Sequence, residues 1–297
     1  MISKNTFAII GGDLRQYYLA KSLKSDKNTA YIYGFEKSIN TKTFCNQNMS
    51  LDDIIKNSNY VILPIPITRD KENINAPFAK NKIILNEQFI SLLNNKSIFG
   101  GIISQITNYF NVKNCNLYDY NTENFKILNA DLTSEAAIKF TMSYCDVSLF
   151  KKKILIVGYG RIGKILSKLL KNMNNDITVC ARNAKDLWWA SLNNFNTFNT
   201  NDIAENLNFD IIFNTVPAII FTEKILNLLD KKTYIIDLAS TPGGVDFEAA
   251  KKMKLKVHQA LGLPGKIFPE NAGEIVKKII YEIIKEKKLW KKESQVS

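Results

Sequence analysis

The sequence predicts an α/β fold of two domains with mainly parallel sheets. Its 297 residues are enough for two domains of ordinary size, each with its own core. Short apolar runs alternate with amphipathic helical stretches in two successive series, which start at residues 7–10 and 154–157. A glycine-rich turn follows the first run of each series, as expected where a strand leads directly into a helix. We therefore expect two Rossmann-like domains, joined by a connecting helix and a returning C-terminal helix.

The first domain is expected to cover residues 1–130 and to be Rossmann-like or flavodoxin-like. After the strand at residues 7–10, the turn Gly11-Gly12-Asp13 leads into a helix that reaches about Ser25. Further strands are predicted at residues 30–33, 60–63 and 97–103, because these are short apolar runs between loops rich in Asn, Pro and Lys.

The second domain is expected to cover residues 131–297 and to include both the connecting and the C-terminal helix. We predict the connecting helix at residues 134–150, with Thr133 or Ser134 as its N-cap. Strands are predicted at residues 154–157, 177–181, 211–213, 234–238 and 256–260. Ile and Val recur at helical spacing from Ile275 to Ile284, which predicts an amphipathic final helix.

The composition excludes several classes of function. The net charge is +12, but only four of the 40 Lys and Arg residues are arginine, and the lysines are spread along the whole chain. A nucleic-acid-binding face more often clusters arginine among aromatic residues, so we expect no nucleic-acid partner. No run approaches the ~20 apolar residues of a membrane helix, and the N-terminus lacks a signal-peptide layout, so we expect a cytoplasmic protein without membrane contact.

The cysteines predict neither a disulfide framework nor a metal site. Cys45, Cys115, Cys145 and Cys180 form no C-x-x-C pair, and none is near the single histidine, His258, in the sequence. We expect reduced cysteines packed as small apolar residues and no bound metal.

The segment Gly158-Tyr159-Gly160-Arg161-Ile162-Gly163 predicts a dinucleotide site, because it lies between a strand and an amphipathic helix. Gly158 permits the tight turn, Gly160 lets the backbone approach a pyrophosphate, and Gly163 lets the helix pack close to the sheet. The free N–H groups of the helix N-terminus would then face the phosphates. The alternative is a glycine-rich turn in a domain that has lost its ligand.

The end of the second strand of this domain favours NADP over NAD. An NAD site usually has Asp or Glu at this strand end, whereas here the chain reads Ala181-Arg182-Asn183. Arg182 could pair with a 2′-phosphate and Asn183 could donate a hydrogen bond to it, and Arg161 adds positive charge nearby. NAD stays open as the alternative.

Two later loops are expected to complete this site. Thr215, Val216 and Pro217 follow one strand, while Asp237, Leu238, Ala239 and Ser240 end the next and lead to Gly243-Gly244. Asp237 is either catalytic or a structural carboxylate that accepts hydrogen bonds from its own loop. The cofactor-binding candidates are Gly158, Tyr159, Gly160, Arg161, Ile162, Gly163, Ala181, Arg182, Asn183, Thr215, Val216, Pro217, Leu238, Ala239, Gly262 and Pro264.

Four segments, in this order and spacing, resemble the family of dipicolinate synthase A subunits from endospore-forming bacteria. They are residues 11–16 (GGDLRQ), 158–163 (GYGRIG), 237–247 (DLASTPGGVDF) and 262–265 (GLPG). The resemblance covers nearly the whole chain, and the pairing of the first segment with the last two is more specific than the glycine motif.

The resemblance implies a function in sporulation. It implies an NAD(P)-dependent oxidation of dihydrodipicolinate, or of its hydroxylated precursor, to dipicolinate, in the mother-cell cytoplasm and together with the flavoprotein-like B subunit of dipicolinate synthase. It implies a C-terminal domain similar to the cofactor domain of D-2-hydroxyacid dehydrogenases. Those enzymes use a catalytic histidine, but His258 lies within a strand-like run, so it is either catalytic or a structural histidine.

A flat dicarboxylate substrate requires cations or N–H donors, and we expect the first domain to bind it. Arg15 is the first candidate, and Arg69, Lys266 and the Gly243-Gly244 loop are weaker ones. Asp13 either accepts a proton or caps the first helix. The candidate catalytic residues are Asp13, Arg15, Asp237 and Ser240.

Three functions remain open at this point: an NAD(P)-dependent oxidoreductase, a non-catalytic subunit that binds cofactor and substrate while the B subunit performs the redox step, and a nucleotide sensor or nucleic-acid-binding protein. A homo-oligomer is possible in each case.

Overall fold

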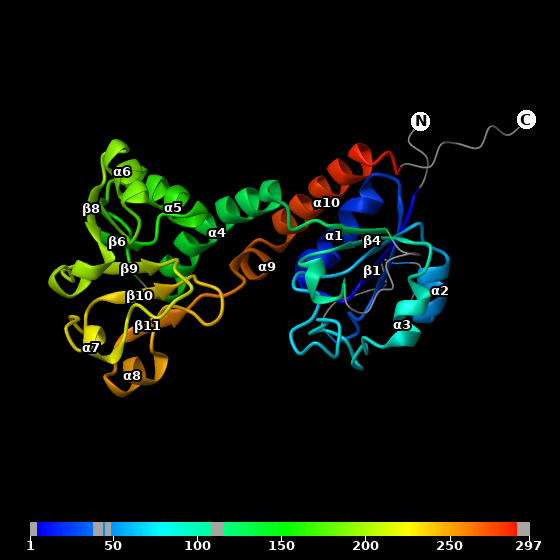
Figure 1. The fold of residues 1–297 in the computed structure, drawn as a ribbon, viewed down its shortest axis with the longest axis horizontal. Coiled ribbons are helices and arrows are strands. Elements are labelled where there is room, and N and C mark those ends of the chain that lie inside the picture. Colours follow the sequence, from blue (N-terminus) through cyan, green and yellow to red (C-terminus); the bar gives the residue numbers. More distant parts are fainter. Residues whose placement is uncertain (1–4, 38–43, 45–48, 108–115, 146, 290–297) are drawn as a thin grey trace, which may run out of the picture. The chain divides into compact units, whose positions relative to one another are not determined.

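The computed structural model describes residues 5–37, 44, 49–107, 116–145 and 147–289, which form two compact units (Figure 1). The first unit comprises Met1–Leu128 and Phe268–Ser297, and the second comprises Asn129–Ile267. Each unit is built around one sheet in which every described pair of neighbouring strands is parallel. The predicted α/β fold with two mainly parallel sheets is therefore confirmed.

The sheet of the first unit has the strand order β2-β1-β3-β4-β5. This is the flavodoxin-like order, in which the chain reverses direction across the sheet between β1 and β3. Ligands of such sheets bind outside the carboxyl ends of the strands at this switch point. The strands are β1 (Thr6–Ile10), β2 (Thr29–Tyr33), β3 (Tyr60–Ile62), β4 (Ser97–Gly100) and β5 (Asn116–Asp119).

Short polar side chains begin the helices of the first unit. Asp13, Ser50 and Asn86 cap α1 (Leu14–Ser25), α2 (Leu51–Lys56) and α3 (Glu87–Leu92), and each accepts a hydrogen bond from a backbone N–H of the first turn. The predicted cap at Asp13 is thus confirmed. The 3-10 helix η2 (Ile103–Gln105) follows β4, so that strand ends earlier than expected.

The last helix, α10 (Pro269–Glu286), belongs to the first unit, and its expected place in the second domain is wrong. Its apolar stripe of Val276, Ile279, Ile280 and Ile284 is at most 1% exposed and shares a core with Leu19 and Leu23 of α1. A Cβ at Gly273 would lie 2.7 Å from Arg15 O and Leu19 N, so glycine allows α10 to approach the α1 backbone closely. The stripe is buried against α1, which decides the unit to which the helix belongs.

The connecting helix is α4 (Glu123–Tyr144), which begins earlier than the predicted residues 134–150. Thr133 and Ser134 are not its caps. They lie inside the helix, where their hydroxyls donate hydrogen bonds to Asn129 O and Ala130 O one turn earlier. The predicted cap was wrong because Ser and Thr can satisfy their hydroxyls within a helix as well as at its start.

The sheet of the second unit has the strand order β11-β10-β9-β6-β7-β8. Numbered within this unit, this is the dinucleotide-binding order 3-2-1-4-5-6 read from the opposite edge. The switch point lies between β6 and β9. The strands are β6 (Lys153–Val157), β7 (Asp176–Ala181), β8 (Asn196–Asn199), β9 (Ile211–Asn214), β10 (Tyr234–Asp237) and β11 (Lys256–Gln259).

Helices of the second unit follow the strands and cover the sheet (Figure 1). Leu166 and Leu170 of α5 are buried, and on the sheet itself Leu155 and Ile212 belong to a core that also contains Leu226 of α7. The helices are α5 (Arg161–Asn172), α6 (Ala184–Leu192), the 3-10 helix η4 (Thr200–Glu205), α7 (Glu223–Leu226), α8 (Phe247–Lys252) and α9 (Leu263–Ile267).

Candidate functional site

The glycine loop joins β6 to α5 and has the geometry that a phosphate site requires. Gly158 has a φ of +94°, which favours glycine, and its N–H donates to Cys180 O on β7 at 2.8 Å. A Cβ at Gly163 would collide with Gly158 O, so only glycine lets α5 start this close to the strand. A Cβ at Gly160 would meet no atom within 4 Å, which leaves space for a ligand to approach the backbone.

The N-terminus of α5 is suited to bind an anion. Gly160 is its N-cap and supplies no side-chain hydrogen bond to the first turn. Arg161, Ile162 and Gly163 form that turn, so their backbone N–H groups carry the positive end of the helix dipole.

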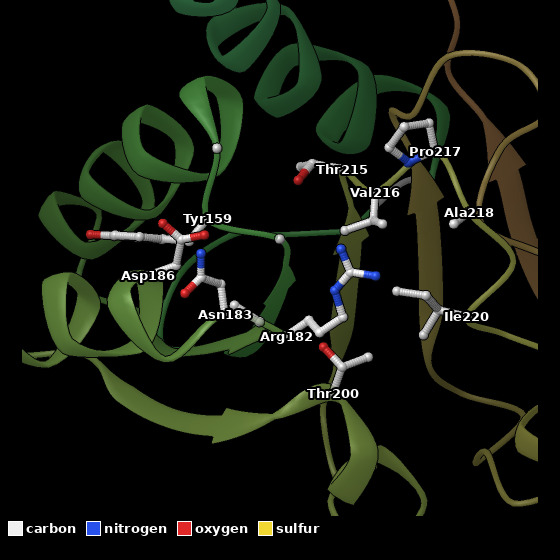
Figure 2. Close-up of a pocket in the computed structure, with 13 residues that line it drawn as sticks. Tyr159, Arg182, Asn183, Asp186, Thr200, Thr215, Val216, Pro217, Ala218 and Ile220 are labelled. Atoms are coloured by element: carbon white, nitrogen blue, oxygen red, sulfur yellow. The ribbon is translucent and has the colours of Figure 1, made fainter.

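A pocket of about 590 Å³ lies beside this loop, at the carboxyl ends of β6, β7 and β9 (Figure 2). It contains nine of the predicted cofactor-binding residues. Asp186, Thr200, Ala218 and Ile220 also line it and were not predicted from the sequence. The lining residues are Gly158, Tyr159, Gly160, Ala181, Arg182, Asn183, Asp186, Thr200, Thr215, Val216, Pro217, Ala218 and Ile220.

Arg182 and Asp186 place opposite charges in this pocket. Figure 2 shows the Arg182 guanidinium turned toward Val216 and Ile220, while Asp186 lies on the side of Asn183 and Tyr159. The side chain of Asn183 caps α6 by accepting a hydrogen bond from Lys185 N at 2.9 Å. Asp186 lies in the first turn of α6, where a carboxylate interacts favourably with the helix dipole. Because this position explains an acidic residue by itself, the sequence did not indicate that Asp186 also lines the pocket.

Asn214 and Asp237 form a buried polar brace behind the pocket, at the ends of β9 and β10. Both residues are 0% exposed, and Asn214 Nδ2 donates to Asp237 Oδ1 at 2.8 Å. Asp237 also accepts from Ala239 N at 3.2 Å and from Gly244 N at 3.0 Å. The carboxylate therefore bonds to backbone N–H groups of its own loop, which is the structural alternative considered for Asp237.

The brace holds the part of the pocket wall that follows β9. Asn214 Nδ2 donates to Val216 O, and Ile220 N and Phe221 N both donate to Gly244 O at 3.0 Å. A Cβ at Gly244 would collide with Asn214 Nδ2, so this position requires glycine. Asn214 and Asp237 thus fix the loop that carries Val216, Pro217 and Ile220.

The remaining predicted residues of the second unit lie outside the pocket lining. Leu238 and Ala239 are buried after β10, and Ser240 is exposed. Gly262 has a φ of +66° and precedes α9, in which Pro264 is buried. Asp13 and Arg15 belong to the first unit.

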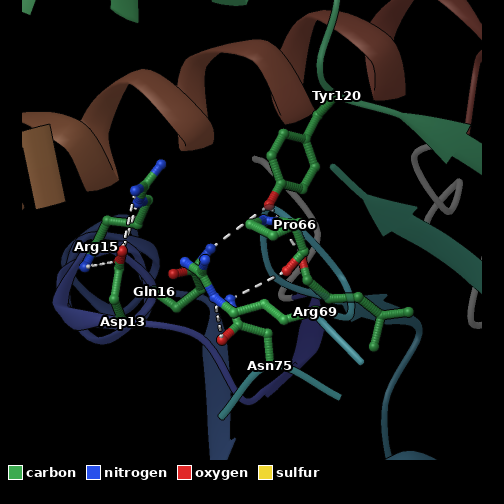
Figure 3. A network of polar contacts seen from close by, with 8 residues as sticks. Asp13, Arg15, Gln16, Pro66, Arg69, Asn75 and Tyr120 are labelled. Atoms are coloured by element: carbon green, nitrogen blue, oxygen red, sulfur yellow. Dashed lines mark hydrogen bonds and ion pairs between the residues drawn. The ribbon is translucent and has the colours of Figure 1, made fainter. Parts of the chain in front are cut away.

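The first unit has a polar network at the carboxyl ends of its strands (Figure 3). Arg15 forms a two-point ion pair with Asp13, with Nε–Oδ1 and Nη2–Oδ2 distances of 2.9 Å. Tyr120 OH donates to Leu63 O at 3.0 Å, and Gln16 Nε2 donates to Tyr120 OH at 3.5 Å. Arg69 Nε donates to Asn75 Oδ1 at 3.3 Å.

His258 and the described cysteines have structural surroundings. His258 lies on β11 between the rings of Tyr234 and Phe140, with centroid distances of 6.4 and 6.2 Å, and burial lowers its pKa. Burial raises the pKa of the Cys180 thiol to about 11, so this cysteine stays protonated. Cys45 and Cys115 lie outside the described residues.

The described residues contain no cluster of three or more side chains able to hold a metal ion. Within the same part of the chain, no helix combines the length and the apolar character needed to cross a membrane.

Comparison with known proteins finds similarity to one family of enzyme subunits. Residues 6–121 match the family model described as the N-terminal domain of the dipicolinate synthase A subunit. The chain is 26% identical over 296 residues to the A subunit of dipicolinate synthase of Bacillus subtilis strain 168, covering 96% of this chain and 98% of that protein.

Solved structures agree with this comparison. The crystal structure of the dipicolinate synthase A subunit from Bacillus halodurans has a TM-score of 0.81 and 25% identity, over 96% of this chain and 99% of that one. An NAD-dependent formate dehydrogenase of Staphylococcus aureus, solved in complex with NAD, is similar in fold, with a TM-score of 0.52 and 12% identity over 94% of this chain and 95% of that chain. The sequence resemblance is thus confirmed: the chain is similar over nearly its whole length to dipicolinate synthase A subunits.

Proposed function

We propose that this chain is the NAD(P)-dependent oxidoreductase subunit that oxidises dihydrodipicolinate, or its hydroxylated precursor, to dipicolinate. The observation that carries the proposal is the pocket at the glycine loop, in which nine predicted cofactor-binding residues come together. The similarity to a dipicolinate synthase A subunit supports the substrate, a small dicarboxylate, and the B subunit of the same enzyme as the partner. The same similarity supports a role in sporulation, in the cytoplasm of the mother cell.

The residues of the pocket fit a dinucleotide. The open space at Gly160 and the uncapped start of α5 would accept the pyrophosphate. Thr215, Val216 and Pro217 would flank the ribose and nicotinamide side. The likeness in fold to a dehydrogenase solved with NAD supports a nicotinamide cofactor.

NADP is the proposed cofactor because Arg182 is the first residue after β7, where an NAD site usually has a carboxylate. The Arg182 guanidinium would pair with the 2′-phosphate. Asp186 acts against this preference, since its carboxylate lines the same pocket and would repel a phosphate placed near it. We therefore expect a moderate preference for NADP over NAD, set by the balance of these two side chains.

Formation of an aromatic ring from a dihydropyridine is downhill and requires the loss of a hydride and a proton. The bound nicotinamide would accept the hydride. The protein would contribute mainly by positioning, which alone can remove much of a reaction barrier. The Asn214–Asp237 brace serves this purpose, because it fixes the loop at Val216 and Pro217.

The second candidate is a non-catalytic subunit that binds cofactor and substrate while the B subunit performs the redox step. One observation favours it: Asp186 is the one carboxylate among the described residues that line the pocket, and none of them is histidine, lysine or cysteine. The buried Asp237 lies behind the pocket, and both of its carboxylate oxygens already accept hydrogen bonds.

The test combines purified chain, NADP or NAD, and freshly generated dihydrodipicolinate, with absorbance followed at the band of the reduced nicotinamide and dipicolinate formation followed separately. Reduction of the nicotinamide with the chain alone supports the oxidoreductase. Dipicolinate formation that needs the B subunit, and that proceeds without reduction of the nicotinamide, supports the second candidate. No product under any condition refutes both.

Cofactor preference is tested by titration of NADP and NAD into wild type and Arg182→Asp. Loss of the charge-assisted contact should reduce the NADP to NAD affinity ratio about 10- to 100-fold. Lys185→Asp is the matched control, because it makes the same charge change on the exposed start of α6 outside the pocket lining. An unchanged ratio in Arg182→Asp would refute the assignment of the 2′-phosphate contact.

A further inference from the structure

The first unit carries a second candidate site, at the switch point of its own sheet. Its residues come from the turn after β1, from the loop after β3, and from Tyr120, which directly follows β5 (Figure 3). In open parallel sheets, this edge is where ligands bind. All of its residues belong to the first unit, and none of them lines the pocket of the second unit.

Arg15, the first candidate from the sequence, is committed to another partner. Its Nε and Nη2 atoms hold both oxygens of Asp13, and its side chain is only 11% exposed. Its charge is therefore largely neutralised within the turn. The pair holds the start of α1 in place, where Asp13 is also the N-cap.

Arg69 is available to a ligand. Its Nε atom donates to Asn75 Oδ1, and Asn75 Nδ2 donates to Pro66 O at 3.2 Å, so the guanidinium is held by its inner nitrogen. Within the described residues, its two terminal nitrogens have no hydrogen bond or ion pair, and the side chain is exposed. A guanidinium oriented in this way presents a fork that matches a carboxylate.

The neighbouring carboxylate does not compete for Arg69. Asp70 accepts hydrogen bonds from Thr68 Oγ1, Glu72 N and Asn73 N and Nδ2, at 2.8 to 3.2 Å. These bonds, with the Asn73 side chain first, lower the pKa of Asp70. The acid is thus ionised and bound within its own loop.

Gln16 supplies a second, independent sign of a ligand. The residue is 1% exposed, and its Oε1 atom has no hydrogen-bond partner among the described residues. A buried acceptor without a donor costs about 1–3 kcal/mol, so a native protein that keeps one usually has a ligand or water to satisfy it. Oε1 lies over Gly12, at 2.5 Å from where a Cβ would be, and Gly12 N donates to Asn75 O at 2.7 Å. Gln16 Oε1 and Asn75, the residue that holds Arg69, therefore both contact Gly12.

We propose that Arg69 binds a carboxylate of a small ring ligand at this edge, and that Gln16 Oε1 accepts a hydrogen bond from an N–H or O–H group of the same ligand. The identification of that ligand as the dicarboxylate substrate rests on the proposed function. The hydrogen bond to Gln16 Oε1 would make the site prefer substrate over product. A substrate that carries an N–H or O–H group satisfies Gln16, whereas the aromatic ring nitrogen of dipicolinate carries no hydrogen at neutral pH and leaves Gln16 unsatisfied. The product is then held by Arg69 but not by Gln16.

The test uses two probes and calorimetry on the full chain, with and without NADP. Piperidine-2,6-dicarboxylate has ring N–H groups, and pyridine-2,6-dicarboxylate has the same carboxylates without them. Arg69→Gln should weaken both probes about 10- to 100-fold, and Gln16→Met should weaken only the piperidine probe, about 3- to 10-fold. Lys82→Gln, which removes one exposed positive charge of the same unit outside the network, should change neither affinity by more than about twofold.

Thermal melting of each variant confirms that the fold is kept. Undetectable binding of both probes to the wild type at millimolar concentration overturns the proposal, as does equal affinity of wild type and Arg69→Gln. Equal effects of Gln16→Met on the two probes overturn the role of Gln16. NADP binding is measured separately. If the proposed cofactor site is wrong, NADP does not bind, but the probes still bind in a manner that depends on Arg69.

Discussion

Asp237→Asn tests whether the polar brace supports the second unit. The side chain is fully buried and accepts from Asn214 Nδ2, Ala239 N and Gly244 N at 2.8, 3.2 and 3.0 Å. An asparagine amide replaces one oxygen by an NH₂ group, so in either orientation at least one donor faces another donor. The less costly orientation keeps the two bonds at Oδ1 and loses the one to Gly244 N.

The magnitude follows from that single loss. A hydrogen bond to a charged group contributes about 1.5–3 kcal/mol, and an unsatisfied buried N–H costs about 1–3 kcal/mol. We expect Asp237→Asn to lower the free energy of unfolding by about 3–5 kcal/mol, measured by urea titration. Since Gly244 O holds Ile220 N and Phe221 N, NADP binding should weaken as well.

Asp246→Asn is the matched control. Asp246 caps α8 by accepting from Ala249 N at 3.0 Å, and asparagine is about as good an N-cap as aspartate. We expect a change below about 0.5 kcal/mol for this variant. If both variants unfold at the same urea concentration as the wild type, the brace does not contribute to stability and our reasoning is wrong.

Three further predictions concern other parts of the chain. Ile280→Ala should destabilise the first unit by about 2–5 kcal/mol in urea titration, because this side chain is 0% exposed in the core, whereas Lys278→Ala on the exposed face of α10 should change stability by less than about 0.5 kcal/mol. Gly163→Ala should abolish measurable NADP binding in calorimetry, since its Cβ would collide with Gly158 O and displace the start of α5; unchanged affinity would contradict the close packing described. Burial lowers the pKa of His258 from 6.5, so the unfolded chain binds this proton more readily, and stability should fall as the pH drops below about 6.5 and level off below the folded pKa; a thermal melting series should show this part of the pH dependence vanish in His258→Gln, and its persistence would contradict the assignment.

The sequence predicted the central strands of both sheets and the edge strands β2 and β11, but it missed the edge strands β5 and β8. β6 and β9 have continuous apolar runs, which periodicity detects. β5 reads NLYD and β8 reads NTFN, and each lies at an edge of its sheet with partly exposed side chains. Such strands carry little apolar signal because only one neighbour and one face bury them.

The candidate site was predictable where the backbone dictates the residue, and less so where a side chain arrives from another segment. Gly158, Gly160 and Arg182 were found because a tight turn and a strand end have known requirements. Thr200 reaches the pocket from the 3-10 helix after an unpredicted strand, so its position depended on a missing element. We now rank Arg69 above Arg15 as the candidate that binds the substrate carboxylate. Only the structure shows that Asp13 pairs with Arg15 and that Asp70, beside Arg69, accepts hydrogen bonds within its own loop.

The contribution of α10 to the first unit has a consequence for synthesis of the chain. Because α10 completes a core that also contains residues of β1 and α1, the second unit is an insertion within the first. During translation, the second unit can therefore fold while the apolar face of α1 still lacks its partner, and the first unit closes only when the last helix leaves the ribosome. A chain truncated before Val276 should thus expose Leu19 and Leu23 and aggregate, even though every residue of the second unit is present.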